Sequence, residues 1–162
     1  MPDNNNHAFK TIFYSGLVAG VLDILAAFLI TIVVMGRSSV EKILQYIASA
    51  AIGPTAFKGG WQTALAGLLF HFLIAFVFAA IYYAAIRKID FLWRQPFISG
   101  LLYGVLVWVI MNFAVIPLST LKTQSMTADK GTILVFLANV FCVGLPIALI
   151  CAKNYSTAVR KS

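Results

Sequence analysis

Four apolar runs, each long enough to cross a lipid bilayer, constrain this chain more than any other feature. They occupy Ile12–Met35, Gln62–Ile86, Pro96–Pro117 and Gly131–Ala152. A helix of about 20 residues crosses the roughly 30 Å hydrocarbon core of a membrane. Hydrophobic residues make up 61% of the chain, whereas a soluble domain rarely exceeds about half. The sequence therefore predicts an all-α integral membrane protein, a bundle of four transmembrane helices.

The polar segments at the two ends of the sequence set off one central membrane domain. We expect a polar N-terminal tail at 1–10, one membrane domain at 11–153 and a basic C-terminal tail at 154–162. The first apolar run is about twice as long as the apolar part of a cleavable signal peptide, which has 7–15 residues. We therefore expect it to be retained as the first span.

The connection between the first two runs contains a second type of helix. Ser38, followed three residues later by Glu41, is typical of a capping box at a helix start. Apolar residues then recur on one helical face until Gly53-Pro54. We expect a short amphipathic helix at about 39–52 that lies on the membrane surface. It covers the mouth of the bundle in one interpretation and acts as a lid or sensor in another.

The basic residues predict the orientation of the chain in its membrane. With the N-terminus inside, the inner segments hold seven Lys and Arg residues and the outer loops hold five. The positive-inside rule then places both termini in the cytoplasm. Trp93, Tyr82 and Tyr83 would form an inner aromatic belt, with Trp61 in the outer one. The net charge of +7 predicts contact with anionic lipid headgroups rather than with nucleic acid, for which there is no motif.

Two stretches near the inner ends of the first and third runs resemble each other. "SGLVAGVL" at 15–22 and "SGLLYGVL" at 99–106 share six residues. Either the chain contains two copies of one helical hairpin, or the similarity arose by chance. Each stretch places two glycines four residues apart, a spacing that lets helices approach closely. We expect close contact between the first and third spans, or dimerisation through the same face, at Gly16, Gly20, Gly100 and Gly104.

Each apolar run contains one strongly polar side chain. These are Asp23, His71, Asn112 and Asn139. A carboxylate at the centre of a transmembrane helix costs on the order of 2.5–3.5 kcal/mol, so it marks a candidate functional site. The spacing puts Asp23 on the same face as Gly16 and Gly20, and it puts His71 on a stripe of small residues that includes Gly67.

These side chains admit two interpretations. In the first, Asp23 and His71, with Asn139 and Asn112 nearby, line a polar pocket that opens outward and carries a proton or binds a cationic solute. In the second, the same four residues only fix helix packing through hydrogen bonds of about 0.6–2 kcal/mol each.

Motifs of common enzymes and cofactor sites do not occur in the sequence. It lacks GxSxG, HExxH, Walker A and GxGxxG. One histidine in the spans cannot make a bis-histidine haem site, and Asp23, His71 and Asn139 fall short of the four ligands of a closed metal site. The two cysteines, Cys142 and Cys151, are expected to fill space as small apolar residues. We therefore expect no enzymatic activity, no cofactor and no metal.

Two stretches carry a resemblance to known proteins. "IASAAIGPTAFKGGWQTALAGLLFHFLIAFVFAAIYY" and "GLLYGVLVWVIMNFAVIPLS" resemble a widespread group of small proteobacterial four-span membrane proteins. The chain is more remotely similar to the YagU-like inner-membrane family. The resemblance covers Gly16 to about Leu118 and implies a bacterial inner membrane, but it implies no activity and no catalytic residue.

Three functional hypotheses follow. The first is a small membrane protein that binds or transports a ligand at Asp23 and His71. The second is a protein that works like the small multidrug antiporters, with Asp23 exchanging protons for lipophilic cations. The third is a structural or regulatory scaffold that senses lipid, forms a homo-oligomer or associates with another membrane protein.

Overall fold

The structure is a computed structural model that describes residues 5–36, 38–116 and 130–160. Every regular element in these ranges is helical. Four of the helices are long and apolar enough to cross a membrane, at Asn6–Val34, Gly60–Ile86, Pro96–Val115 and Lys130–Thr157. This confirms the prediction of an all-α chain with four candidate spans. The third predicted connection, 118–130, lies outside the described residues except for Lys130.

Three of the four long helices change from α-helical to π-helical winding. The first span is α1 (Asn5–Phe28) continued by η1 (Leu29–Val34), and the second is α3 (Gly60–Ile86). The third is α5 (Pro96–Ile110) continued by η3 (Met111–Val115). The fourth consists of α7 (Lys130–Ala138), η4 (Asn139–Gly144) and α8 (Leu145–Arg160). Both expected tails are therefore helical where they are described, because α1 already includes Asn5 and α8 reaches Arg160.

Short helices connect the spans. The amphipathic helix α2 (Val40–Ile52) lies close to the predicted range and is followed by the 3-10 helix η2 (Pro54–Lys58). Its N-cap is Ser39, whose hydroxyl accepts a hydrogen bond from the Lys42 amide at 3.4 Å. The prediction of Ser38 as the cap was wrong by one residue, because Ser39 has the extended backbone that an N-cap needs. The connection after α3 contains α4 (Asp90–Arg94).

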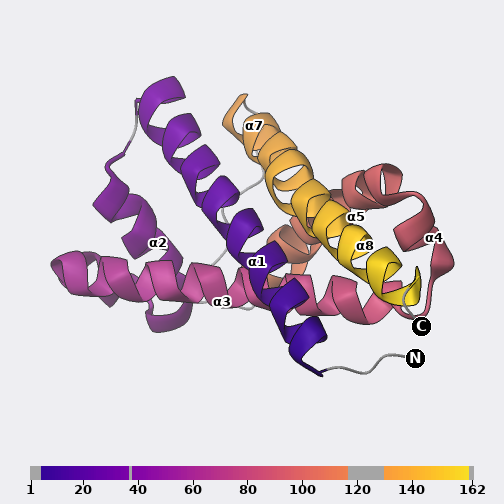
Figure 1. Cartoon of the computed structure of the whole chain (residues 1–162). Helices are drawn as coiled ribbons and strands as arrows, with labels where there is room; N and C mark the ends of the chain where they lie inside the picture. The colour runs from indigo at the N-terminus through magenta and orange to yellow at the C-terminus, as the bar shows by residue number, and fades with distance from the viewer. Residues whose placement is uncertain (1–4, 37, 117–129, 161–162) are drawn as a thin grey trace.

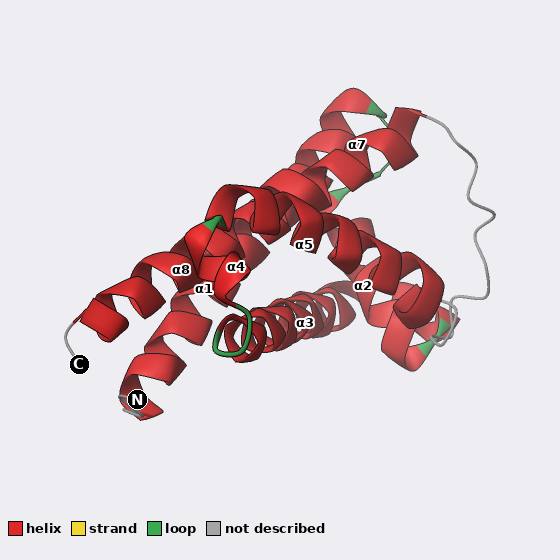
Figure 2. Cartoon of the chain, turned by 90° about the vertical axis from the view of Figure 1, so that its right-hand side faces the viewer, coloured by secondary structure: helices red, strands yellow, loops and turns green. Residues whose placement is uncertain are grey.

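The helix α1 lies between α3 and α8 and packs against both (Figure 1). The amphipathic α2 packs against α3, and α5 packs against η4 and α8. Both views place the start of α1, the passage from α3 to α4, and the end of α8 together (Figure 2). We call this the terminal end of the bundle, and we call the opposite end, with α2, η2 and the start of α7, the α2 end.

The glycine pairs do not bring the first and third spans together. A methyl group added at Gly16 or Gly20 would meet the rings of Phe76 and Phe72 on α3. At Gly100 and Gly104 it would meet backbone atoms of η4 and α8. The expected contact between spans one and three was wrong, because each glycine pair faces the next span along the chain. Gly67 faces the backbone of α2 at Leu44.

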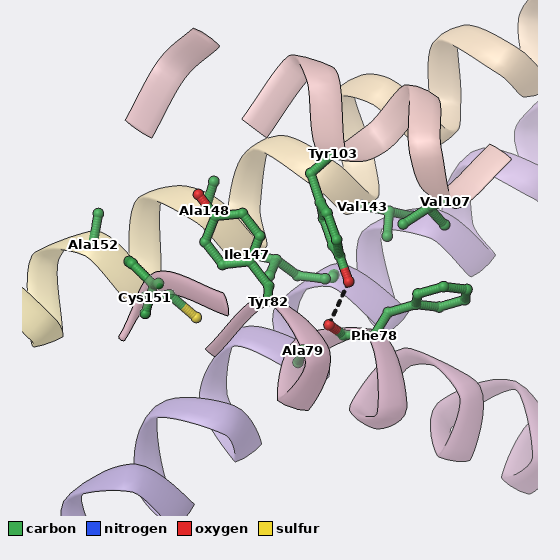
Figure 3. Packing of buried hydrophobic residues seen from close by; sticks show 12 residues of the cluster. Phe78, Ala79, Tyr82, Tyr103, Val107, Val143, Ile147, Ala148, Cys151 and Ala152 are labelled. Carbon is green, nitrogen blue, oxygen red and sulfur yellow. Dashed lines mark hydrogen bonds between the residues drawn. The ribbon is translucent and has the colours of Figure 1, made fainter. Parts of the chain in front are cut away.

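The main core lies between α1, α3, α5 and α8, toward the terminal end (Figure 3). Tyr82 is only 1% exposed, so its assignment to an aromatic belt was wrong. Its ring lies 4.8 Å from that of Tyr103, and its hydroxyl shares a 2.8 Å hydrogen bond with Ser99. The Tyr103 hydroxyl donates to the Phe78 carbonyl at 2.6 Å. These bonds join α3 to α5 and satisfy phenol groups that would be costly to bury unpaired.

Candidate functional site

The acid Asp23 lies on the side of α1 that faces the other helices. Its neighbours Ala19 and Ile24 are 0% and 6% exposed, whereas Leu22 and Leu25 are 40% and 55% exposed. The exposed leucines mark the outer face of the helix, and Asp23 is directed away from it. The carboxylate therefore does not point into the surroundings of the bundle.

Asp23 faces ionisable groups on two neighbouring elements. It lies within electrostatic range of His71 on α3 and of Cys142 on η4. Within the described part of the chain, no group donates a hydrogen bond to its carboxylate. Two oxygens with up to four acceptor positions are thus open toward the junction of α1, α3 and η4.

His71 is held against α1 by one hydrogen bond. Its Nε2 lies 2.9 Å from the carbonyl oxygen of Gly20, one turn before Asp23. Because a carbonyl only accepts, Nε2 carries the proton, and Nδ1 of the neutral ring is an acceptor. The ring therefore keeps its contact with α1 through Nε2 and leaves Nδ1 as a hydrogen-bond acceptor.

Small residues position this imidazole. His71 follows Gly67, which is buried against α2, and precedes Ala75, which is 7% exposed and packs toward α1. Phe72 lies edge-on to the imidazole, at 5.5 Å between ring centroids, and fills the space over Gly20. A side chain at Gly20 would displace the Phe72 ring and move the adjacent imidazole. Close approach of α1 and α3 is thus what brings His71 to Asp23.

Two buried apolar clusters of different size flank Asp23 and His71, one toward each end of the bundle. Toward the α2 end, Ile24, Leu44 and Ala64 form a small buried cluster, which places α2 over the site. Toward the terminal end lies the larger core, which begins at Ala19 and Phe78.

The two asparagines do not join Asp23 and His71 through hydrogen bonds. The Asn112 amide donates to the Trp108 carbonyl at 2.8 Å, and the Asn139 amide donates to the Val135 carbonyl at 3.1 Å. Both side chains lie where a helix widens to π-helical winding. Each asparagine amide thus bonds the carbonyl four residues earlier on its own helix. This local role accounts for both residues.

Sequence reasoning missed two features around the site. Cys142, which was interpreted as filler, is partly exposed and lies near Asp23. The second is a set of buried hydroxyl and thiol groups toward the terminal end. There the thiol of Cys151 lies 3.6 Å from the Ser15 hydroxyl. The shared position of Ser15 and Ser99 in the two similar stretches was a signal for this set.

Comparison with known proteins adds no relative to this description. No protein family, curated protein or solved structure matches the chain. Within the described ranges, no three His, Cys, Asp or Glu side chains lie close enough together to hold a metal ion.

Proposed function

We propose that this chain is a small multi-pass protein of a bacterial inner membrane that binds a proton at Asp23 and His71 and exchanges it for a monovalent cation. The observation that carries this proposal is the carboxylate of Asp23, which faces the bundle within electrostatic range of His71 and accepts no hydrogen bond from any described residue. An acid enclosed in an apolar span is costly, so it is best explained by a ligand that it binds.

The surroundings of Asp23 favour a single positive charge as the ligand. The other described acids are Glu41 on α2 and Asp90 on α4, and Asp90 belongs to the terminal end. A divalent cation prefers several oxygen ligands, whereas one carboxylate balances a proton or a monovalent cation. His71 supports the exchange because its Nδ1 can accept the proton while Nε2 stays bound to Gly20.

The direct test measures proton release from purified protein in weakly buffered detergent solution. Addition of tetraphenylphosphonium or of sodium should release protons from the wild-type protein, and Asp23→Asn should abolish this release. Asp90→Asn is the matched control because it removes an exposed acid of α4, and it should release as many protons as the wild type. No release from the wild-type protein with either cation would contradict the proposal.

A structural scaffold is the second candidate, and one observation favours it. The hydrogen bond between His71 and the Gly20 carbonyl links two spans and would by itself fix the register of α1 on α3. In this case, Asp23→Asn and His71→Gln would change thermal stability or oligomeric state. Neither would change proton release, and His7→Gln serves as the matched control for the histidine substitution.

A further inference from the structure

The terminal end of the bundle carries lysines without acidic partners. Lys10 on α1, Lys88 after α3 and Lys153 on α8 are all exposed. Asp90, the acid described at this end, lies 3.5 Å from Arg94 and accepts a hydrogen bond from the Trp93 indole at 3.3 Å. Its charge is therefore already matched by Arg94. Within the described ranges, none of the three lysines has an ion pair.

Aromatic rings lie among these charges at the contact between α4 and α8. The rings of Trp93 and Tyr155 are 6.3 Å apart, and the guanidinium of Arg94 lies 5.1 Å from the Trp93 ring. Trp and Tyr favour the headgroup level of a bilayer because their rings are apolar on one side and polar on the other. They indicate that α4 lies at this level.

Apolar side chains at the same end remain exposed beside the cations. Ile89, Phe91 and Phe97 are 50%, 44% and 56% exposed. A surface that combines exposed apolar side chains with unpaired lysines matches the boundary between acyl chains and anionic headgroups. A soluble acidic partner or a nucleic acid would match the lysines but leave these apolar side chains in water.

We propose that the terminal end binds the phosphate headgroups of anionic phospholipids in the adjoining leaflet. Lys10, Lys88 and Lys153 supply the attraction, and Trp93 and Tyr155 set the depth at which α4 lies. This surface is separate from Asp23 and His71, and the proposal does not depend on their function. Each lysine near an anionic membrane surface strengthens binding by about fivefold.

The opposite end of the bundle offers a matched control. Lys42 on α2, Lys58 on η2 and Lys130 on α7 are also exposed, but their end includes Glu41 and has no arginine among the described residues. The substitutions Lys10→Gln, Lys88→Gln and Lys153→Gln therefore form one triple variant. Lys42→Gln, Lys58→Gln and Lys130→Gln form another, and both remove the same charge.

The experiment compares phosphatidylglycerol with phosphatidylcholine as the bound lipid. Full-length protein in detergent receives an equal mixture of both, and native mass spectrometry counts the lipids retained. Wild-type protein should retain phosphatidylglycerol preferentially. The terminal-end triple variant should lose this preference by on the order of 100-fold if the three lysines act independently, and the α2-end triple variant should stay within about threefold of the wild type.

Two results would overturn the proposal. One is a wild-type protein that shows no preference for phosphatidylglycerol. The other is an equal loss of this preference in both triple variants, because it would then depend on net charge alone. Circular dichroism and size-exclusion chromatography check that the variants fold. If a triple variant does not fold, the single substitutions Lys153→Gln and Lys130→Gln provide the same comparison, with an expected difference of about fivefold.

Discussion

The two stretches that share six residues, 15–22 and 99–106, make different kinds of contact. In the first, Gly16 and Gly20 lie under the phenyl rings of Phe76 and Phe72. In the second, Gly100 and Gly104 lie against the backbone of η4 and α8, with Gly144 facing both. The same spacing of glycines thus serves packing mainly against phenyl rings in one hairpin, with the Phe76 backbone also near Gly16, and packing mainly against helix backbone in the other.

The residue that follows each stretch shows what this difference permits. Asp23 follows the first stretch and faces His71, which sits next to the Phe72 ring. Val107 holds the corresponding position after the second stretch and is 2% exposed in the main core. Rings can shift by rotation, whereas two backbones in contact cannot. We infer that the more adaptable contact, α1 on α3, is the one that accommodates a polar site.

The largest effect is expected for Gly144→Ala. Its methyl group would lie against the backbone of both Gly100 and Gly104, so neither helix can yield without moving as a whole. We expect a loss of about 3 kcal/mol or more in the free energy of unfolding, measured by denaturation in mild detergent. A loss below 1 kcal/mol would contradict the idea that the glycine contacts of the second hairpin are less adaptable than those of the first.

Val107→Asp places an acid at the position that corresponds to Asp23. The new carboxylate would lie in an apolar core without an imidazole beside it. We expect the free energy of unfolding to fall by about 2.5–3.5 kcal/mol in the same denaturation experiment. Val107→Asn, which carries no charge, should lose less. If the two variants were equally stable, the second hairpin would tolerate an acid as well as the first.

The reverse substitution, Asp23→Val, introduces the residue of the second stretch into the first. Removal of an intramembrane acid should stabilise the protein, by about 2 kcal/mol, because His71 keeps its bond to Gly20. The variant should also lose cation-driven proton release. A destabilised Asp23→Val protein would indicate that the acid holds the helices together.

Gly20→Ala should have the smallest effect on stability. Its methyl group would meet Phe72 ring atoms at 2.8 Å and the Ala75 methyl at 3.3 Å, and the ring can turn aside. The higher helix propensity of alanine, about 1 kcal/mol, offsets part of the cost. We expect a net loss of about 1 kcal/mol in the free energy of unfolding, measured by denaturation. Proton release should fall several-fold, because the displaced ring moves the neighbouring imidazole.

The sequence was sufficient to predict the four long helices and α2, but it was insufficient to predict which helices pack against each other. Length and hydropathy located the four long helices, and the apolar face after Ser39 located α2. The glycine spacing indicated close approach but carried no information on which helix approaches, since any helix surface can fill the space over a glycine. Tyr82 was misplaced for a similar reason, because a tyrosine near the end of a span suits a headgroup belt and a hydrogen-bonded core equally well.

The candidate site was predictable only in part. Intramembrane polarity singled out Asp23 and His71, and the structure brings them within electrostatic range of each other. The same criterion included Asn112 and Asn139, which bond the carbonyls of Trp108 and Val135 on their own helices and lie in π-helical segments. Apolar residues surround both positions in the sequence, so no local pattern indicated this winding.

The most direct test of the central claim is a double-mutant comparison of proton movement. Wild-type protein, Asp23→Asn, His71→Gln and the double variant are placed in vesicles loaded with a pH indicator, and a cation gradient drives proton exchange. If Asp23 and His71 act as one unit, each single variant loses as much of the rate as the double variant does. A proton exchange rate in Asp23→Asn equal to that of the wild type would contradict the account.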